Sequence, residues 1–103
     1  MKTAFVTGGS RGIGSAIALA LGKTFHVVVG FANSEDKAND VVKEIIAAGG
    51  SASTVQIDIS DAESVDNAFT TIEKEYNSVD VLINNAGVTK DNILPRMKED
   101  EWL

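Results

Sequence analysis

The chain has 103 residues, enough for one small domain, and its hydrophobic and charged shares of 44% and 23% are those of an ordinary globular protein. Its formal net charge of -6 argues against nucleic-acid binding, because phosphate contacts need clustered lysines and arginines. The lack of cysteine excludes a disulfide or thiolate metal site, and no apolar run reaches the roughly 18 residues of a membrane span. We therefore expect a cytoplasmic protein without a metal ion, a nucleic-acid partner or a membrane partner.

The first part of the chain predicts a strand, a glycine-rich turn and a helix. Residues 3–6 form a short apolar run that indicates a buried strand, and two glycines end it. Ile13, Ile17 and Leu21 then recur every four residues. This spacing predicts a helix with these three side chains on its inward face.

The next part predicts a second strand, a helix and a third strand. Three consecutive valines at 27–29 indicate a strand buried on both faces. The helix that follows is capped by Asn33 or Ser34 and ended by the two glycines at 49–50. Residues 53–57 indicate the third strand. The apolar side chains expected on one side of the helix are Val41, Val42, Ile45 and Ile46.

The last part predicts another helix, a fourth strand and the start of one further helix. Residues 60–63 have the form of a capping box, with Ser60 as the N-cap of the helix. Residues 79–83 indicate the fourth strand, and residues 98–103 resemble an opening helical turn with acids favoured by the helix dipole. The inward side chains of the capped helix are expected to be Val65, Ala68, Phe69 and Ile72.

The alternation of strands and helices predicts an α/β fold, a Rossmann-type doubly wound parallel sheet with helices on both faces. Right-handed crossovers favour the strand order 3-2-1-4. A helix of one turn at the chain's end is marginal, and the fourth strand would keep an open edge. We therefore expect residues 1–103 to be the N-terminal, dinucleotide-binding part of a single domain, truncated before a fifth strand.

The turn between the first strand and the first helix has the glycine spacing of a phosphate site. A pyrophosphate needs bare backbone N–H groups at a helix N-terminus, where side chains would hold it away. A nucleoside-triphosphate loop is excluded, because no lysine precedes Ser15. The strand before and the helix after argue against a turn used only for tight packing. The segment reads Thr7-Gly8-Gly9-Ser10-Arg11-Gly12-Ile13-Gly14.

This octapeptide and the tetrapeptide at 84–87, Asn-Asn-Ala-Gly, together resemble the TGxxxGxG and NNAG signatures of the short-chain dehydrogenase/reductase family. The resemblance covers all 103 residues. Within the family, residues 84–102 are most similar to bacterial members that reduce 3-oxoacyl groups on acyl carrier protein, and acetoacetyl-CoA reductases share a similar stretch. The resemblance implies NADPH-dependent reduction of a 3-oxoacyl thioester to the 3-hydroxyacyl product in fatty-acid biosynthesis.

The resemblance also assigns residues to the coenzyme. Asp58 would accept a hydrogen bond from the adenine amino group, with backbone support from Ile59, or would only cap a turn or helix. Asn84 and Asn85 either contact the coenzyme or tie neighbouring strands together. The residues expected to bind the coenzyme are Gly8, Gly9, Ser10, Arg11, Gly12, Ile13, Gly14, Asn33, Asp58, Ile59, Asn85, Ala86 and Gly87.

NADP is the expected coenzyme rather than NAD. Enzymes that prefer NAD usually carry an acid at the end of the second strand, where this chain has Phe31. Arg11 lies in the turn where related NADP enzymes keep a basic residue, and its guanidinium suits a phosphate dianion. Asn33 would add a hydrogen bond, whereas Glu35 and Asp36 nearby count against this choice.

No catalytic residue is expected within the chain. The family's chemistry uses a tyrosine with a lysine four residues later, together with a serine and an asparagine. The only tyrosine, Tyr76, is followed four positions on by Asp80 and so fails this pattern. We therefore predict that the 103-residue chain alone has no reductase activity. His26, the only histidine, is expected at the surface or at a strand edge rather than as a metal ligand.

Two other functions stay open. One is a short-chain dehydrogenase with a different substrate, such as an acetoacetyl-CoA reductase, and the other is a coenzyme-binding module without catalysis. Lys90, Arg96 and Lys98 would either reach an acidic carrier protein or lie in a solvated loop. For the longer protein the resemblance implies a homotetramer that acts on a substrate linked to acyl carrier protein or to CoA.

Overall fold

The computed structural model describes residues 1–9 and 12–85. Within these ranges the four predicted strands and the first three predicted helices are present, whereas the turn predicted at 98–103 lies outside them. No helix of this part is long and apolar enough to cross a membrane. The elements are β1 (Thr3–Thr7), α1 (Gly12–Leu21), β2 (His26–Phe31), α2 (Glu35–Ala47), β3 (Ser51–Gln56), α3 (Ala62–Tyr76) and β4 (Val81–Asn84).

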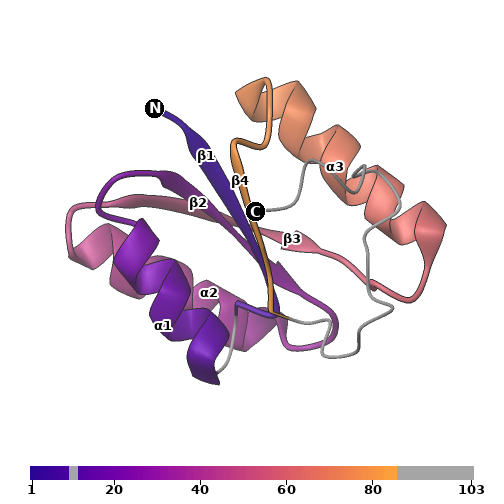
Figure 1. Ribbon diagram of the computed structural model, residues 1–103. Helices are drawn as coiled ribbons and strands as arrows, with labels where there is room; N and C mark the ends of the chain where they lie inside the picture. Colours follow the sequence, from indigo (N-terminus) through magenta and orange to yellow (C-terminus); the bar gives the residue numbers. More distant parts are fainter. Residues whose placement is uncertain (10–11, 86–103) are drawn as a thin grey trace.

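The four strands form one parallel sheet with the order β3-β2-β1-β4, as predicted (Figure 1). In the register of the sheet, Phe5 of β1 lies opposite Val28 of β2 and Leu82 of β4. Because all strands run the same way, their carboxyl ends meet at one edge. The turn after β1 and the segments after β2, β3 and β4 therefore gather there, the usual place for a ligand in open α/β sheets.

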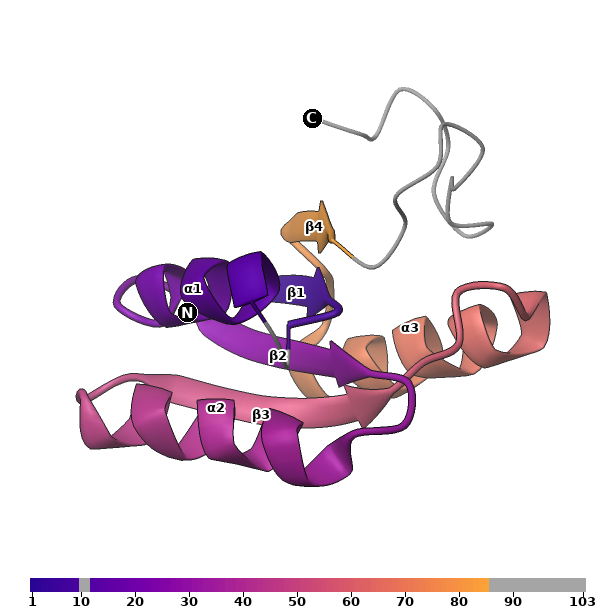
Figure 2. The same cartoon turned by 90° about the horizontal axis from the view of Figure 1, so that it is seen from below.

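Helices cover both faces of the sheet, with α1 and α2 on one face and α3 on the other (Figures 1 and 2). The alternating side chains of each strand explain this arrangement. Phe5 points toward α3 and packs edge-on against Phe69, with 5.4 Å between the ring centroids. Its neighbour Val6 points the other way, into a cluster with Ala18 of α1 and Ile45 of α2. The prediction of a doubly wound α/β fold is confirmed.

The predicted inward face of α3 is confirmed, but its predicted cap is wrong. The buried side chains of this helix are those predicted. Its N-cap is Asp61, whose carboxylate accepts a hydrogen bond from the amide of Glu63 at 3.0 Å. Ser60, the residue before Asp61, does not cap the helix, because its hydroxyl donates to the carboxylate of Asp58 at 2.6 Å instead. The sequence therefore has the spacing of a capping box, but in the structure Asp61 and not Ser60 is the N-cap of α3.

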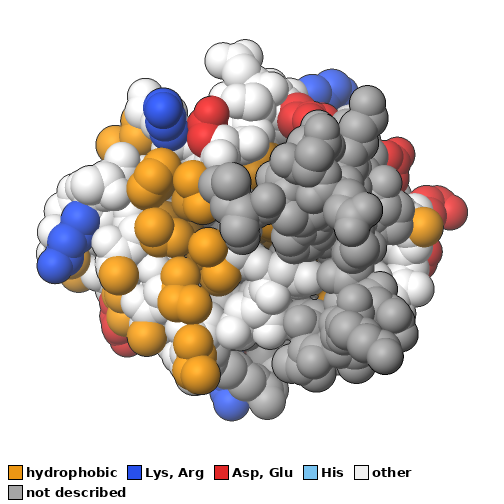
Figure 3. All heavy atoms as spheres, viewed as in Figure 1, with side chains coloured by type: hydrophobic (Ala, Val, Ile, Leu, Met, Phe, Trp, Pro, Cys, Tyr) orange, Lys and Arg blue, Asp and Glu red, His pale blue; other side chains and the backbone are white. Residues whose placement is uncertain are grey.

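The predicted inward face of α1 is also wrong in part. Ile17 and Leu21 are half-buried against the core, but Ile13 is 74% exposed, and the buried residues of the helix are Gly14 and Ala18. The helix is apolar on almost every side, with Ser15 as its one polar side chain, so periodicity could not select the inward face. Accordingly, apolar side chains gather over α1 in Figure 3.

Helix α2 follows its prediction with one exception. Val41 and Ile45 are buried and Val42 is half-buried, but Ile46 is 55% exposed. Ala38 takes the remaining inward position, because residues three and four apart share a helix face. The helix ends at the predicted glycine pair, where Gly49 has a φ of 90° that favours glycine.

Candidate functional site

Gly8 and Gly9 follow β1, and α1 begins at Gly12, as the phosphate-site prediction requires. Gly8 and Gly12 have φ values of 66° and 53°, in the left-handed region that favours glycine. Gly9 is buried, and its amide donates to the carbonyl oxygen of Gly30 in β2 at 3.2 Å. Gly9 therefore anchors the turn to the sheet, and its N–H group is already used. Ser10 and Arg11 lie outside the described residues.

Gly14 allows α1 to begin in direct contact with this turn. A Cβ atom on Gly14 would collide with the carbonyl oxygen of Gly8 and would lie 2.6 Å from the side-chain nitrogen of Asn85. That nitrogen donates to the same Gly8 oxygen at 3.2 Å. The turn, the first turn of α1 and the residue after β4 therefore meet at a single carbonyl group.

Asn84 and Asn85 both tie neighbouring segments together, which is one of the two roles considered for them. The hydroxyl of Thr7 lies 3.0 Å from the side-chain oxygen of Asn84 and can donate to it, which links β1 to β4. Asn85 links the end of β4 to Gly8. Contact of Asn85 with a coenzyme stays a prediction. Thr7 was not among the predicted site residues, although it is the first letter of the TGxxxGxG signature.

The N-terminus of α1 has the properties of an anion site. Its first turn carries no acidic side chain, and the first N–H groups of a helix have no partner within the helix. The helix dipole adds partial positive charge at this end. Gly12 has open space where a Cβ atom would stand, and Ile13 is exposed beside it. The residues present therefore fit a diphosphate.

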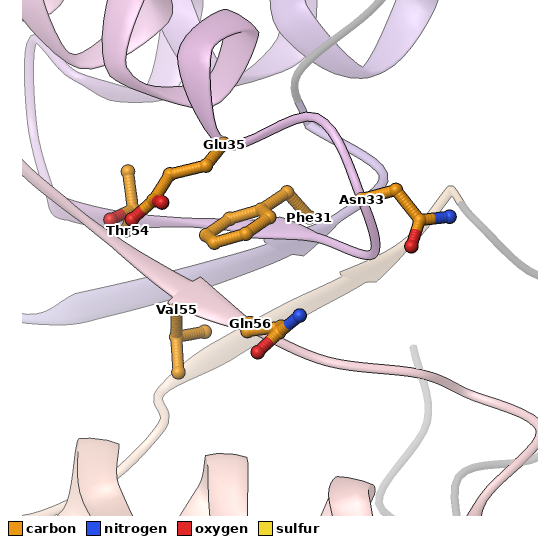
Figure 4. Close-up of a pocket in the computed structure, with 6 residues that line it drawn as sticks. All are labelled: Phe31, Asn33, Glu35, Thr54, Val55 and Gln56. Carbon is orange, nitrogen blue, oxygen red and sulfur yellow. The ribbon is translucent and has the colours of Figure 1, made fainter.

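Two hollows lie side by side at the carboxyl ends of β2 and β3. Asn33 and Gln56 line both of them. In the larger hollow the Glu35 carboxylate extends over the Phe31 ring toward Thr54, away from Asn33 (Figure 4). The larger hollow, about 410 Å³, is lined by Phe31, Asn33, Glu35, Thr54, Val55 and Gln56, and the smaller, about 280 Å³, by Ala32, Asn33, Gln56, Asp58, Asp61 and Ser64.

Asp58 is held in a turn and faces the smaller hollow. Hydrogen bonds from the hydroxyl and the amide of Ser60 reach its Oδ1 atom at 2.6 and 3.0 Å. These bonds favour the charged form and lower the pKa of the Asp58 carboxyl. Within residues 1–9 and 12–85 no donor reaches its other oxygen, Oδ2. The turn-capping role is therefore observed, and adenine recognition stays a prediction, as does the supporting role of half-buried Ile59.

Tyr76 and His26 lie at the opposite, amino-terminal edge of the sheet. His26 is half-buried and is the first residue of β2, so of the two predicted positions, at the surface or at a strand edge, it takes the second. Its Nδ1 and Nε2 atoms lie 2.6 and 3.1 Å from the hydroxyls of Ser51 and Ser53, and its ring centroid lies 4.2 Å from that of Tyr76. Burial lowers the pKa of the His26 imidazole, and the nearby Glu75 carboxylate opposes this shift. Tyr76 therefore belongs to a packing cluster remote from the phosphate turn.

The comparisons with known proteins establish the family. The model of the short chain dehydrogenase family matches residues 2–103. The chain belongs to this family. It is 48% identical over 102 residues to a 3-oxoacyl-acyl-carrier-protein reductase of Staphylococcus epidermidis and 49% identical to one of Synechocystis. Each alignment covers 98% of this chain but only 42% and 41% of the relative, so the chain spans about two fifths of their length.

Solved structures of the family resemble the fold closely. A short-chain dehydrogenase/reductase from Serratia marcescens matches with a TM-score of 0.78 at 39% identity, over 84% of this chain and 36% of that one. A metagenomic short-chain oxidoreductase in complex with NADP matches with a TM-score of 0.80 at 40% identity, over 98% of this chain and 46% of that one. The Rossmann-type fold of the chain is thus the fold of its family.

Proposed function

We propose that the chain is the coenzyme-binding half of an NADP-dependent short-chain reductase that converts 3-oxoacyl-acyl-carrier-protein to the 3-hydroxyacyl product in fatty-acid biosynthesis. The observation that carries the proposal is the contact of Gly14 and Asn85 with the carbonyl of Gly8, which holds the start of α1 against a bare glycine turn. The names of the curated relatives support the choice of substrate.

In this proposal the first turn of α1 binds the pyrophosphate of the coenzyme. The backbone N–H groups of Gly12, Ile13 and Gly14 would donate to it, because the helix itself leaves them unpaired. Gly9 would contribute through the shape of the turn, since its own amide bonds to β2. The nicotinamide group supplies a hydride when it is bound. The chain's residues supply binding and orientation.

The adenosine end would lie in the hollows at the ends of β2 and β3. Asp58 would accept a hydrogen bond from the adenine amino group through its Oδ2 atom. Phe31 carries no charge that would repel a 2′-phosphate, and Asn33 would donate to that phosphate. Arg11 would supply the positive charge. A family member of 40% identity in complex with NADP supports this choice of coenzyme.

The chain itself would provide no catalytic group. Tyr76 lacks a lysine four residues later, and it packs against His26 at the edge of the sheet remote from the turn. We therefore expect the 103-residue chain to consume no NADPH with an acetoacetyl thioester. Five residues of this proposal lie outside the described residues: Ala86 and Gly87 of the tetrapeptide, and the proposed carrier contacts Lys90, Arg96 and Lys98.

The test is a titration of the 103-residue chain with NADPH, followed by nicotinamide fluorescence. Ile13→Asp places a negative charge beside the proposed pyrophosphate, and the side chain is already exposed, so folding is retained. The matched control is Ile46→Asp, which makes the same replacement at an exposed isoleucine in the last turn of α2. We expect Ile13→Asp to weaken binding about tenfold and the control less than twofold. Equal affinities of the two variants would contradict the proposal.

An acetoacetyl-CoA reductase is the second enzymatic alternative, and a coenzyme-binding module without catalysis is the alternative from another class. Both alternatives predict the same NADPH affinities for the chain and its variants, because both bind the coenzyme at the glycine turn after β1. They separate in the longer protein, where the reductase consumes NADPH with an acyl-carrier-protein or CoA thioester and the binding module consumes none.

A further inference from the structure

A side chain extends the pairing of β2 and β3 beyond the ends of the two strands. Gln56, the last residue of β3, lies opposite Phe31, the last residue of β2. The amide of Ile57 donates to the carbonyl oxygen of Phe31 at 2.8 Å. The side-chain nitrogen of Gln56 donates to the next carbonyl oxygen, that of Ala32, at 3.2 Å. Gln56 thus ties the loop that leaves β2 to the end of β3.

This loop carries Asn33, and Asn33 is exposed. Within residues 1–9 and 12–85 the Asn33 side chain makes no hydrogen bond, so its amide is available to a ligand. Gln56 and Asn33 together line both hollows, and Figure 4 shows Gln56 below the loop from which Asn33 projects. The carbonyl group to which Gln56 donates therefore belongs to the residue directly before Asn33.

We propose that Gln56 is a positioning residue for the 2′-phosphate of the coenzyme, acting through the Ala32 carbonyl to hold Asn33 in place. The inference rests on the proposed function. A loop that is already fixed loses less conformational freedom when it binds a ligand. The hydrogen bond from Gln56 to Ala32 would therefore raise the affinity for the coenzyme although Gln56 does not contact the 2′-phosphate. No sequence motif marks this residue, because its role depends on the register that places it opposite Phe31.

The competing explanation is that Gln56 only stabilises the edge strand β3. The two explanations differ in which ligand they affect. A positioning role concerns the 2′-phosphate alone, so it affects adenosine 2′,5′-bisphosphate and not adenosine 5′-monophosphate. A general effect on the edge strand would change both affinities by the same factor or would change neither.

The test measures the Kd of both nucleotides for the 103-residue chain and two variants. Gln56→Met keeps the length of the side chain and removes the donor, at an exposed position that folding tolerates. Ser51→Ala, at the other end of the same strand and outside both hollows, removes the hydroxyl that lies 2.6 Å from Nδ1 of His26 and serves as the control. We expect Gln56→Met to raise the Kd of the bisphosphate about fivefold and that of the monophosphate less than twofold, with neither changed by Ser51→Ala.

Three results would overturn the inference. Gln56→Met could leave the bisphosphate affinity unchanged, or weaken the binding of both nucleotides equally, or Ser51→Ala could weaken bisphosphate binding as much as Gln56→Met does. In each of these the original chain still binds the bisphosphate, and the proposed function stands. An original chain that binds neither nucleotide overturns the proposed function, and this inference with it.

Discussion

Gly14 shows how one missing side chain can set the geometry of a site. The carbonyl of Gly8 accepts the amide of Asn85, and Gly14 packs against the same atoms so closely that no Cβ atom fits. The absence of a side chain thus brings the start of α1 against the turn. At this scale the glycine spacing predicted the turn, but it could not tell that Gly9 uses its amide for β2.

Replacement of this glycine has a measurable consequence. Gly14→Ala should lower the free energy of unfolding by about 1–3 kcal/mol, because α1 must move away from Gly8. It should also weaken NADPH binding at temperatures where the variant is folded. Gly49→Ala is the control, since Gly49 has a φ of 90° and open space around it, far from the turn.

Chemical denaturation and coenzyme titration of the two variants check this prediction. Gly49→Ala should cost about 1 kcal/mol and keep the original affinity. A folded Gly14→Ala variant that binds NADPH as tightly as the original chain would contradict the role given to Gly14.

His26 makes stability depend on pH. Burial lowers the pKa of its imidazole below the ordinary value of 6.5, so the folded chain binds the proton less readily than the unfolded chain. This contribution is therefore fully present above pH 6.5 and is lost as the pH falls through the lowered pKa. We expect the free energy of unfolding to decrease with falling pH in this window, before the carboxylates titrate.

Denaturant unfolding between about pH 5 and pH 8, the window in which histidine side chains titrate, measures this effect. His26→Gln keeps a polar side chain near Ser51 and Ser53 and removes the titration. The variant should lose the pH dependence in this window. If the variant keeps the full dependence of the free energy of unfolding on pH, that dependence belongs to groups other than His26.

At the scale of elements, the N-cap of α3 differs between the sequence-based prediction and the structure. The spacing predicted Ser60 as the N-cap, whereas Asp61 accepts the amide of Glu63 and Ser60 bonds to Asp58. We expect Asp61→Ala to lower the free energy of unfolding by about 1 kcal/mol. Thermal unfolding of Asp61→Ala and Ser60→Ala checks this. A larger loss in Ser60→Ala would favour the cap that the sequence predicted.

The elements also show which predictions a sequence can support. The inward face of α3 was predicted correctly because polar residues separate Val65 from the pair Ala68 and Phe69, and that pair from Ile72. In α1 the same reasoning failed for Ile13, because this helix has almost no polar side chain to define its outer face. Gln56 was missed because its contact with Ala32 depends on strand register rather than on any local pattern.

At the scale of the molecule, the parallel sheet brings distant segments together. Thr7 and Asn84 are separated by 77 residues, and the adjacent β1 and β4 place their side chains 3.0 Å apart. The strand order was predictable from the alternation of strands and helices and from the handedness of crossovers. That order makes one edge of the sheet the candidate coenzyme site and leaves the His26 cluster at the other edge.

The most direct test follows the backbone amides by NMR while NADPH is added to the 103-residue chain. We predict that the amide resonances of Gly12, Ile13 and Gly14 shift strongly, because their N–H groups donate to the pyrophosphate. The amide of Gly49, at the far end of α2, should not shift. Saturable binding that leaves the three amides of α1 unchanged would contradict binding of the pyrophosphate at the start of α1.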